Sequence, residues 1–236
     1  MIYVENKRKS LATIRAIYPD AIIIDVTSRG EEPWIKVSPF YPHGGIPVSF
    51  SDSVFSASVE GVWQGLKVFE NEDIDFSKFT NDAMKGLKRT VRKFGKPLGH
   101  RNGVYGTDLL DYGTARRKIY LPTYAWMLDN KAADVVAQLT QMAEEGDVVL
   151  LDYDTNGDIA NLKAPLSHAA LVKLYIEKKN PHLKAVEATA PSTHPPVKER
   201  TVPKTAVKQM TKGKPSKPKP PRAPKRKDNP GQLNLL

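Results

Sequence analysis

The sequence has 236 residues, 19 prolines, no cysteine and a formal net charge of +10. The absence of cysteine excludes disulfide bonds and thiolate metal sites, and it is typical of proteins from a reducing compartment. The longest apolar runs, such as residues 21–24, are far too short to cross a bilayer, and residues 1–10 lack the apolar core of a signal peptide. We therefore expect a cytoplasmic protein without a membrane partner.

The positive charge is concentrated in the last part of the chain. From Lys184 to Leu236 there are 13 Lys and Arg, 3 acids, 10 of the 19 prolines and no aromatic residue, so the remaining residues have a net charge of zero. Such a segment cannot bury enough apolar surface to offset its chain entropy. We predict a globular domain at residues 1–179, a disordered basic linker at 180–230 and a short peptide at 231–236. The linker is expected to bind DNA in a salt-sensitive way.

The first half of the domain shows two short apolar segments and one irregular segment. Buried strands are expected at residues 1–4 and 21–26, with a helix at 9–17 between them. Residues 31–50 are rich in proline, glycine and aromatic residues, and we expect them to be irregular or short-stranded. A helix is expected at 58–70, with Ser58 as its N-cap.

The second half is dominated by helical patterns. Helices are expected at residues 81–94, 107–120 and 123–145, the last with a break near Asn130. A continuous apolar run at 147–153 is typical of a central strand, and a last helix is expected at 165–178. Together these elements predict an α+β class, a helix-rich single domain around a small sheet.

The helix predicted at 58–70 has a narrow polar stripe. Glu60, Gln64 and Lys67 are spaced i, i+4 and i+7, so they share one side of the helix, while Trp63 and other apolar residues occupy the rest. The stripe is either a solvent-facing side of a core helix or a carboxylate, an amide and an ammonium that line a pocket. The aromatic residues of the preceding loop likewise either cap the core or stack on a planar ligand.

A long basic segment follows. Residues 85–101 contain seven Lys and Arg and no acid, and on a helix one face would hold Lys85, Lys88, Arg89, Arg92 and Lys93. This face is either simply solvated or contacts phosphate or nucleic acid. Arg116 belongs to a second basic pair on a predicted helix.

Acidic residues follow the predicted central strand. Asp152, Asp154, Asp158 and His168 lie at or after its carboxyl end, a common place for functional residues in folds of this kind. The segment DTNGD lacks the downstream glutamate of an EF-hand, and there is neither a glycine-rich phosphate loop nor a metal-ligand cluster. We expect no metal and no cofactor.

Two segments, VSPFYP at 37–42 and SVEGVWQGLKVFE at 58–70, resemble the paired motifs of the NADAR superfamily. That family has an SNFYP-like loop followed by a helix of the form S/T-x-E-H-x-x-Q-x-x-K. Pro39 and Gly61 stand where the family usually has Asn and His. The resemblance covers residues 35–176, and the domain also looks like an uncharacterised family of bacteria and phages. The residues that match in type and order are Ser38, Phe40, Tyr41, Pro42, Glu60, Gln64 and Lys67.

The resemblance implies an N-glycosidase that hydrolyses the N-ribosyl bond of a ribosylated base or nucleotide derivative. Its substrates would be riboflavin-pathway intermediates or ADP-ribose-like molecules, including ADP-ribosyl-guanine on DNA. Such bonds break through an oxocarbenium-like state, which a carboxylate stabilises or attacks through an activated water. Glu60 is the candidate for that carboxylate, and Asp154 or Asp158 for a second one. Gln64 would orient a ribose hydroxyl, and Tyr41 or Trp63 would stack on the leaving base. Lys67 would either hold Glu60 ionised or bind a substrate phosphate. The candidate substrate ligands are Ser38, Phe40, Tyr41, Trp63, Gln64, Lys67 and Arg116.

The sequence GQLNLL at 231–236 resembles the bacterial sliding-clamp-binding peptide. A disordered spacer would present Leu233, Leu235 and Leu236 to an apolar pocket, with Gln232 fixing the register. This resemblance implies a bacterial or phage source and a place at the nucleoid. The alternative to an enzyme is a non-enzymatic replication accessory or nucleotide-binding protein, tethered to the clamp in the same way.

Overall fold

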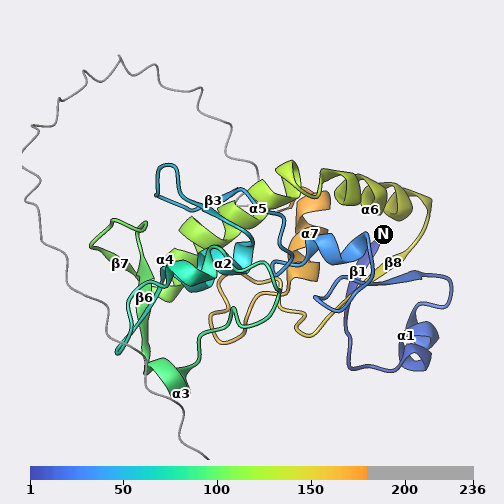
Figure 1. Ribbon diagram of the computed structural model, residues 1–236. Helices are drawn as coiled ribbons and strands as arrows, with labels where there is room; N and C mark the ends of the chain where they lie inside the picture. Colours follow the sequence, from blue (N-terminus) through green and yellow to red (C-terminus); the bar gives the residue numbers. More distant parts are fainter. Residues whose placement is uncertain (180–236) are drawn as a thin grey trace, which may run out of the picture. The chain divides into compact units, whose positions relative to one another are not determined.

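A computed structural model describes residues 1–179 of the chain (Figure 1). The linker predicted at 180–230 and the peptide predicted at 231–236, with Gln232, Leu233, Leu235 and Leu236, lie outside the described residues. Within residues 1–179, no helix combines the length and the apolar composition needed to cross a membrane.

A parallel three-stranded sheet forms the base of the domain. The strand β8 (Val148–Asp152) lies between β1 (Ile2–Asn6) and β2 (Ile22–Asp25), and all five of its residues are buried. Both predicted N-terminal strands and the predicted central strand are thus confirmed. Because the strands are parallel, their carboxyl ends meet at one edge of the sheet, as they do in α/β proteins with ligand sites.

Helices cover both faces of this sheet. On one face α1 (Leu11–Ile17), which begins at the N-cap Ser10, packs Ile14 against Val149 and Leu151. Alternate residues of a strand point to opposite faces, so the neighbouring residues Val148 and Leu150 belong to the larger core on the other side. On that side, α6 (Ala133–Glu145) and α7 (His168–Ile176) contact β8.

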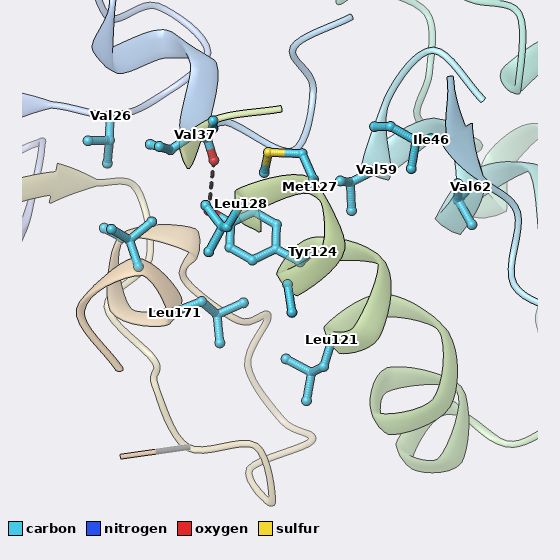
Figure 2. Packing of buried hydrophobic residues seen from close by; sticks show 14 of the residues in the cluster. Val26, Val37, Ile46, Val59, Val62, Leu121, Tyr124, Met127, Leu128 and Leu171 are labelled. Atoms are coloured by element: carbon cyan, nitrogen blue, oxygen red, sulfur yellow. Dashed lines mark hydrogen bonds between the residues drawn. The ribbon is translucent and has the colours of Figure 1, made fainter. Parts of the chain in front are cut away.

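The largest core lies where α5 (Leu121–Asn130) meets these helices and α2 (Val59–Leu66). Figure 2 shows Tyr124 in the middle of this core, with its hydroxyl donating to the carbonyl of Val37 at 2.7 Å. The predicted break near Asn130 is confirmed, because α5 ends there and α6 starts at Ala133. The class is therefore α+β, as predicted.

The helix α2 is shorter than predicted. Ser58 is its N-cap and accepts a hydrogen bond from the amide of Gly61 at 3.0 Å, as expected. The helix ends at Leu66 rather than at residue 70, because Lys67 adopts an extended conformation and starts β5 (Lys67–Phe69). This strand pairs with β6 (Pro97–Arg101), which the sequence pattern did not indicate, and β6 pairs with β7 (Leu109–Leu110).

The helix predicted at residues 81–94 is wrong for most of its length. Only α3 (Val91–Phe94) is helical, and Met84 and Gly86 have positive φ angles of 53° and 68°, which break a right-handed helix. Arg89 gives a second reason, because its side chain is buried and its guanidinium donates to the carbonyls of Gln64, Lys67 and Asp73. The chain is therefore drawn inward at this point instead of presenting a basic helical face.

The remaining elements are short. The helix predicted at 107–120 begins only at Tyr112, where α4 (Tyr112–Ala115) continues into a π-helical turn (Arg116–Tyr120), and β7 lies before it. Residues 31–50 are irregular, as expected, with a 3-10 turn (Trp34–Val37) and β3 (Ile46–Pro47), which pairs with β4 (Phe55–Ser56). The last helix is confirmed as α7, with Ser167 as its N-cap.

Candidate active site

A cavity of about 250 Å³ opens at the carboxyl edge of the parallel sheet. One part of its wall comes from the segments that follow β2 and β8 and precede α7, namely Thr27, Ser28, Asp152, Tyr153, Asp154, Pro165, Leu166 and His168. The other part comes from the irregular loop, α2 and the segments around α4, namely Ser38, Pro39, Phe40, Glu60, Trp63, Lys88, Tyr112, Arg116 and Tyr120. A concave site that combines aromatic rings with a few polar groups is the usual form of a small-molecule site.

Glu60 is held rigidly in the first turn of α2. Its side chain is only 7% exposed, and its Oε1 accepts a hydrogen bond from Nε2 of Gln64 at 2.9 Å. The oxygen of the Gln64 amide in turn accepts from the backbone N–H of Arg89 at 3.1 Å, which fixes the orientation of that amide. Among residues 1–179 no group donates to Oε2 of Glu60. One carboxylate oxygen is therefore positioned by the protein, and the other is left for a ligand or a water.

The environment of Glu60 favours a strong base. Burial raises the pKa of Glu60 above its ordinary value, while the hydrogen bond from Gln64 and the positive charge of Lys88 act in the opposite direction. A carboxylate with a raised pKa accepts a proton more readily, and a general base works best when its pKa approaches the working pH. The position and environment of Glu60 thus suit proton transfer.

Aromatic rings form the second feature of the cavity. Tyr112 and Tyr120 contact Trp63 edge-on, with ring centroids 5.8 and 5.5 Å from that of Trp63. The Nζ of Lys88 lies 5.6 Å from the ring centroid of Phe40. Rings that line a cavity in this way can take up a planar heterocycle, and a lysine beside them can bind an anion.

Trp63 is supported from the side away from the cavity by His100 on β6. The two ring centroids are 3.7 Å apart, and the imidazole is fully buried. Burial and the nearby charge of Lys67 lower the pKa of His100 to about 3, so the ring is neutral. Neither ring nitrogen has a hydrogen-bond partner among the described residues. The contact is therefore one of packing, and it fixes the plane of Trp63.

A second buried carboxylate, Asp152, lies at the end of β8. Its Oδ2 is 3.0 Å from Nδ1 of His168 and accepts from Oγ of Ser167 at 2.8 Å. Burial by itself would raise the pKa of Asp152, but the hydrogen bond and charge of His168 and the hydroxyl of Ser167 outweigh burial and lower this pKa. Asp152 is therefore ionised, and both of its carboxylate oxygens accept hydrogen bonds from protein donors.

Several predicted site residues do line the cavity: Ser38, Phe40, Glu60, Trp63, Arg116, Asp154 and, from the basic segment, Lys88. Others lie elsewhere. The hydroxyl of Tyr41 donates to Glu32 at 2.8 Å, away from the cavity, and Asp158 accepts from the amide of Ala160 at 2.8 Å within its own loop. Gln64 acts on the site through Glu60.

Lys67 and Arg116, which the sequence predicted as substrate ligands, make contacts within the protein instead. Lys67 is half-buried beside the ring of Phe69 and does not line the cavity, although its charge acts on Glu60. The guanidinium of Arg116 is buried and donates to the hydroxyl of Tyr112 and to the carbonyls of Ile159, Asn161 and Ala164 at 2.8–3.1 Å. Arg116 therefore organises the loop that closes one side of the cavity.

The predicted basic face is divided by the structure. Lys85, Arg92 and Lys93 are exposed, Lys88 reaches the cavity, and Arg89 is buried by the backbone carbonyls described above. Arg89 is thus not available to a polyanion, whereas the other four side chains are.

Gly61 has a packing role that explains one departure from the NADAR pattern. A Cβ at this position would lie 2.5 Å from Oγ of Ser56 and 2.7 Å from the carbonyl of Lys78. The space that a histidine would need is thus filled by backbone and a short buried side chain. A residue larger than glycine cannot be accommodated here without moving α2.

The sequence did not indicate Tyr112 or Tyr120 as site residues, and it placed Asp152 and His168 among the candidates after the central strand without pairing them. The signal for the pair was present, since Asp152 ends an apolar strand and His168 starts a helix, but nothing in the spacing showed that they touch. Both tyrosines lie in the segment that the sequence predicted as one regular helix, and a π-helical turn (Arg116–Tyr120) interrupts it. Such turns are frequent at functional sites, although they leave no simple sequence pattern.

Residues 6–172 match the family of unknown function DUF6939. No curated protein matches the chain. In residues 1–179, no three His, Asp or Glu side chains are grouped in a way that would hold a metal ion.

Proposed function

The chain belongs to this family of unknown function, and we propose that it is an N-glycosidase that hydrolyses the bond between a ribose and a nitrogen of a heterocyclic base. One observation carries the proposal. A buried carboxylate, Glu60, lines a cavity with aromatic walls; Gln64 fixes one of its oxygens, and no group among residues 1–179 donates to the other. The resemblance to the NADAR superfamily agrees with this function, and it stays a prediction.

The reaction assigned to the site is the addition of water across the N–C1′ bond. The base leaves with the bonding electron pair, and positive charge develops on C1′ and the ring oxygen of the ribose. Glu60 takes a proton from the attacking water, whose oxygen forms the new bond to C1′. The negative charge of Glu60 also stabilises the cationic ribose. Glu60 then gives the proton that it took from the water to the former bonding nitrogen of the base, which restores the carboxylate. The products are the free base and a ribose with a hydroxyl at C1′.

The aromatic residues would hold the leaving base. Phe40 and Trp63 stand at the cavity wall, so we assign to them the stacking role that the sequence suggested for Tyr41 or Trp63. Ser38 is buried and lines the cavity, so it would contact a ribose hydroxyl. Lys88 lines the cavity and would bind a phosphate of a nucleotide derivative, a role that the sequence suggested for Lys67.

A base-release assay tests the proposal. Purified chain is incubated separately with ADP-ribose, ADP-ribosylated DNA and phosphorylated riboflavin precursors, and the free base or heterocycle is quantified. We expect release from at least one substrate class, and loss of release in Glu60→Gln. Release that is equal in wild type and Glu60→Gln would remove Glu60 from the mechanism. No release from any N-ribosyl substrate would remove the proposed reaction.

The sequence at 231–236 supports a second candidate, a non-enzymatic accessory protein tethered to a sliding clamp. In this case the basic linker would bind DNA loosely, and Leu235 and Leu236 would enter a pocket on the clamp. A pull-down with a bacterial clamp compares the intact chain with the double variant Leu235→Ala, Leu236→Ala. We expect capture of the intact chain alone, and equal capture of both chains would show that the leucines are incidental.

A further inference from the structure

The ring of His168 meets a hydrogen-bond acceptor at each of its two nitrogens. Nδ1 is 3.0 Å from Oδ2 of Asp152, and Nε2 is 2.7 Å from the carbonyl oxygen of Val26. A neutral imidazole has one N–H, so it can donate to only one of these two groups. The second contact requires a further proton, which resides either on His168 or on Asp152.

The partners of Asp152 decide between these two places. Its Oδ2 also accepts from Oγ of Ser167 at 2.8 Å and lies 3.4 Å from the amide of Ala169, and its Oδ1 accepts from the amide of Tyr153 at 2.7 Å. Donors thus surround both oxygens, and this arrangement favours an ionised carboxylate. The proton is therefore on His168, and the pair is a buried imidazolium and carboxylate.

We propose that His168 is a positioning residue of the cavity, held as an imidazolium so that it ties together three segments of the cavity wall; its effect on turnover rests on the proposed function. The carbonyl that it binds belongs to Val26, directly before Thr27 and Ser28. The carboxylate that it binds belongs to Asp152, directly before Tyr153. His168 itself starts α7 and follows Leu166. One ring thus fixes the ends of β2 and β8 and the beginning of α7.

The strand register shows why a ring is needed here. Asp25 and Leu151 are the last paired residues of β2 and β8, so the sheet ladder ends where the cavity begins. Beyond that point Val26 still donates to the carbonyl of Leu151 at a long 3.4 Å, and the residues that follow in both segments line the cavity. Past the end of the β2–β8 ladder, the imidazolium connects the two segments by its contacts with Val26 and Asp152.

The two contacts of the His168 ring depend on pH. Burial by itself would lower the pKa of His168, but the hydrogen bond and charge of Asp152 outweigh burial and raise this pKa, with smaller contributions from the carbonyl of Val26 and the charge of Asp25. Asp25 is itself paired with Lys7. The other titratable groups that face the same cavity are Glu60 on α2, Asp154 after β8, Lys88, Tyr112 and Tyr120. In alkaline solution the ring loses one proton, and it can then donate to only one of its two acceptors.

The test is nuclear magnetic resonance of the full chain labelled with 15N. The imidazole nitrogens of His168 are assigned by the signals that disappear in His168→Gln; if this variant does not fold, they are assigned by the signals that move in Asp152→Asn. His43→Gln is the matched control, because His43 binds a backbone carbonyl, that of Lys36, at 2.8 Å outside the cavity. The backbone amides of Thr27 and Tyr153 report on the two segments that the ring connects.

We expect both nitrogens of His168 to be protonated at about pH 6, and the titration midpoint to lie above about 6.5, the ordinary value. The amide signals of Thr27 and Tyr153 should shift with the same midpoint, and Asp152→Asn should lower that midpoint by about one pH unit or more. His43→Gln should leave all three titrations unchanged. A titration midpoint at or below about 6.5, or amide signals that do not follow the titration of His168, would overturn the proposal.

An activity measurement separates this inference from the proposed function. If the chain releases base, kcat should fall over the same alkaline range, and in Asp152→Asn it should fall at lower pH. A kcat that stays constant through the His168 titration would overturn the positioning role. If no substrate is cleaved, the proposed function fails, and the resonance experiment still decides the state of His168.

Discussion

The two buried carboxylates of the cavity, Glu60 on α2 and Asp152 at the end of β8, have opposite surroundings. Asp152 receives hydrogen bonds from Ser167, Tyr153 and His168, and these bonds lower its pKa. Glu60 receives one side-chain hydrogen bond, from Gln64, and burial raises its pKa. Surroundings that separate the pKa values of two carboxyl groups also separate their roles. A carboxylate with all its acceptor sites occupied holds the structure, whereas one with a free oxygen is available for chemistry.

The largest expected effect that tests this comparison is that of Glu60→Gln on activity. The variant keeps the size of the side chain and an oxygen for the Gln64 amide, but it removes the base. We expect the rate of base release to fall a hundredfold or more, on the order of the usual contribution of a general base. The melting temperature should stay nearly unchanged, because the lost group is a carboxylate that burial already disfavours.

The matched control is Glu72→Gln, which changes the same chemical group on an exposed residue outside the cavity. This control should keep full activity and full stability. A Glu60→Gln protein that melts well below wild type would show that Glu60, like Asp152, is structural. The distinction between the two carboxylates would then be lost.

The second effect concerns Asp152→Asn, for which we expect a change in stability. Removing one partner of a charged buried hydrogen bond leaves His168 without its counter-charge, and the free energy of unfolding should fall by about 2 kcal/mol at pH 7. Urea denaturation measures this difference. Asp154→Asn is the control, because Asp154 is exposed at the cavity and its substitution should leave the stability within about 0.5 kcal/mol.

The same pair predicts the sign of the pH dependence. The pKa of Asp152 is lowered on folding, so its contribution to stability is present above the unfolded value, about 3.9, and is lost as the pH falls through the lower folded value. The pKa of His168 is raised, so its contribution is complete below about 6.5 and is lost as the pH rises through the folded value. The stability difference between wild type and Asp152→Asn should therefore shrink at both ends of the pH range.

A smaller effect is expected for Phe40→Ala, which tests whether the aromatic wall acts in binding alone. Loss of one stacking ring costs about 1–3 kcal/mol per base, so KM should rise about tenfold while kcat changes little. Phe76→Ala is the control, because Phe76 is 53% exposed and does not line the cavity. A fall in kcat with unchanged KM would place Phe40 with Glu60 in the chemical step instead.

The smallest effect is expected for removal of residues 184–236. The domain defined by residues 1–179 contains both cores and both carboxylates, so the free energy of unfolding of a 1–183 fragment should stay within about 0.5 kcal/mol of that of the full chain. Urea denaturation of both proteins provides the comparison. Aggregation of the fragment, or loss of its cooperative transition, would mean that the domain boundary is wrong.

The sequence indicated those parts of the fold that depend on local patterns. The apolar run of β8 and the cap at Ser58 are readable from a few neighbouring residues, and both are confirmed. Of the helix stripe interpreted as a pocket wall, Glu60 lines the cavity, whereas Gln64 and Lys67 do not. In each case the signal and the structure lie within the same short segment.

The failures have a common physical cause, which is that distant backbone groups satisfy a polar side chain. By hydrophobic periodicity Arg89 is expected to be an exposed polar residue. Its hydrogen bonds to the carbonyls of Lys67 and Asp73 instead offset the cost of burying its charge, and the helix predicted around it does not form. The contact between Asp152 and His168 depends on a loop that folds back after β8. No local spacing encodes such partners, because each depends on the completed tertiary structure.

The guanidinium of Arg116 gives the cavity a further property. It donates hydrogen bonds to the carbonyls of Ile159, Asn161 and Ala164, and these three bonds hold the loop between β8 and α7. A loop anchored in this way does not act as a lid, so the entrance of the cavity is already formed before a ligand binds. Binding to such a preorganised site needs no slow rearrangement. Ligand association should therefore be a single-exponential process whose observed rate increases linearly with ligand concentration.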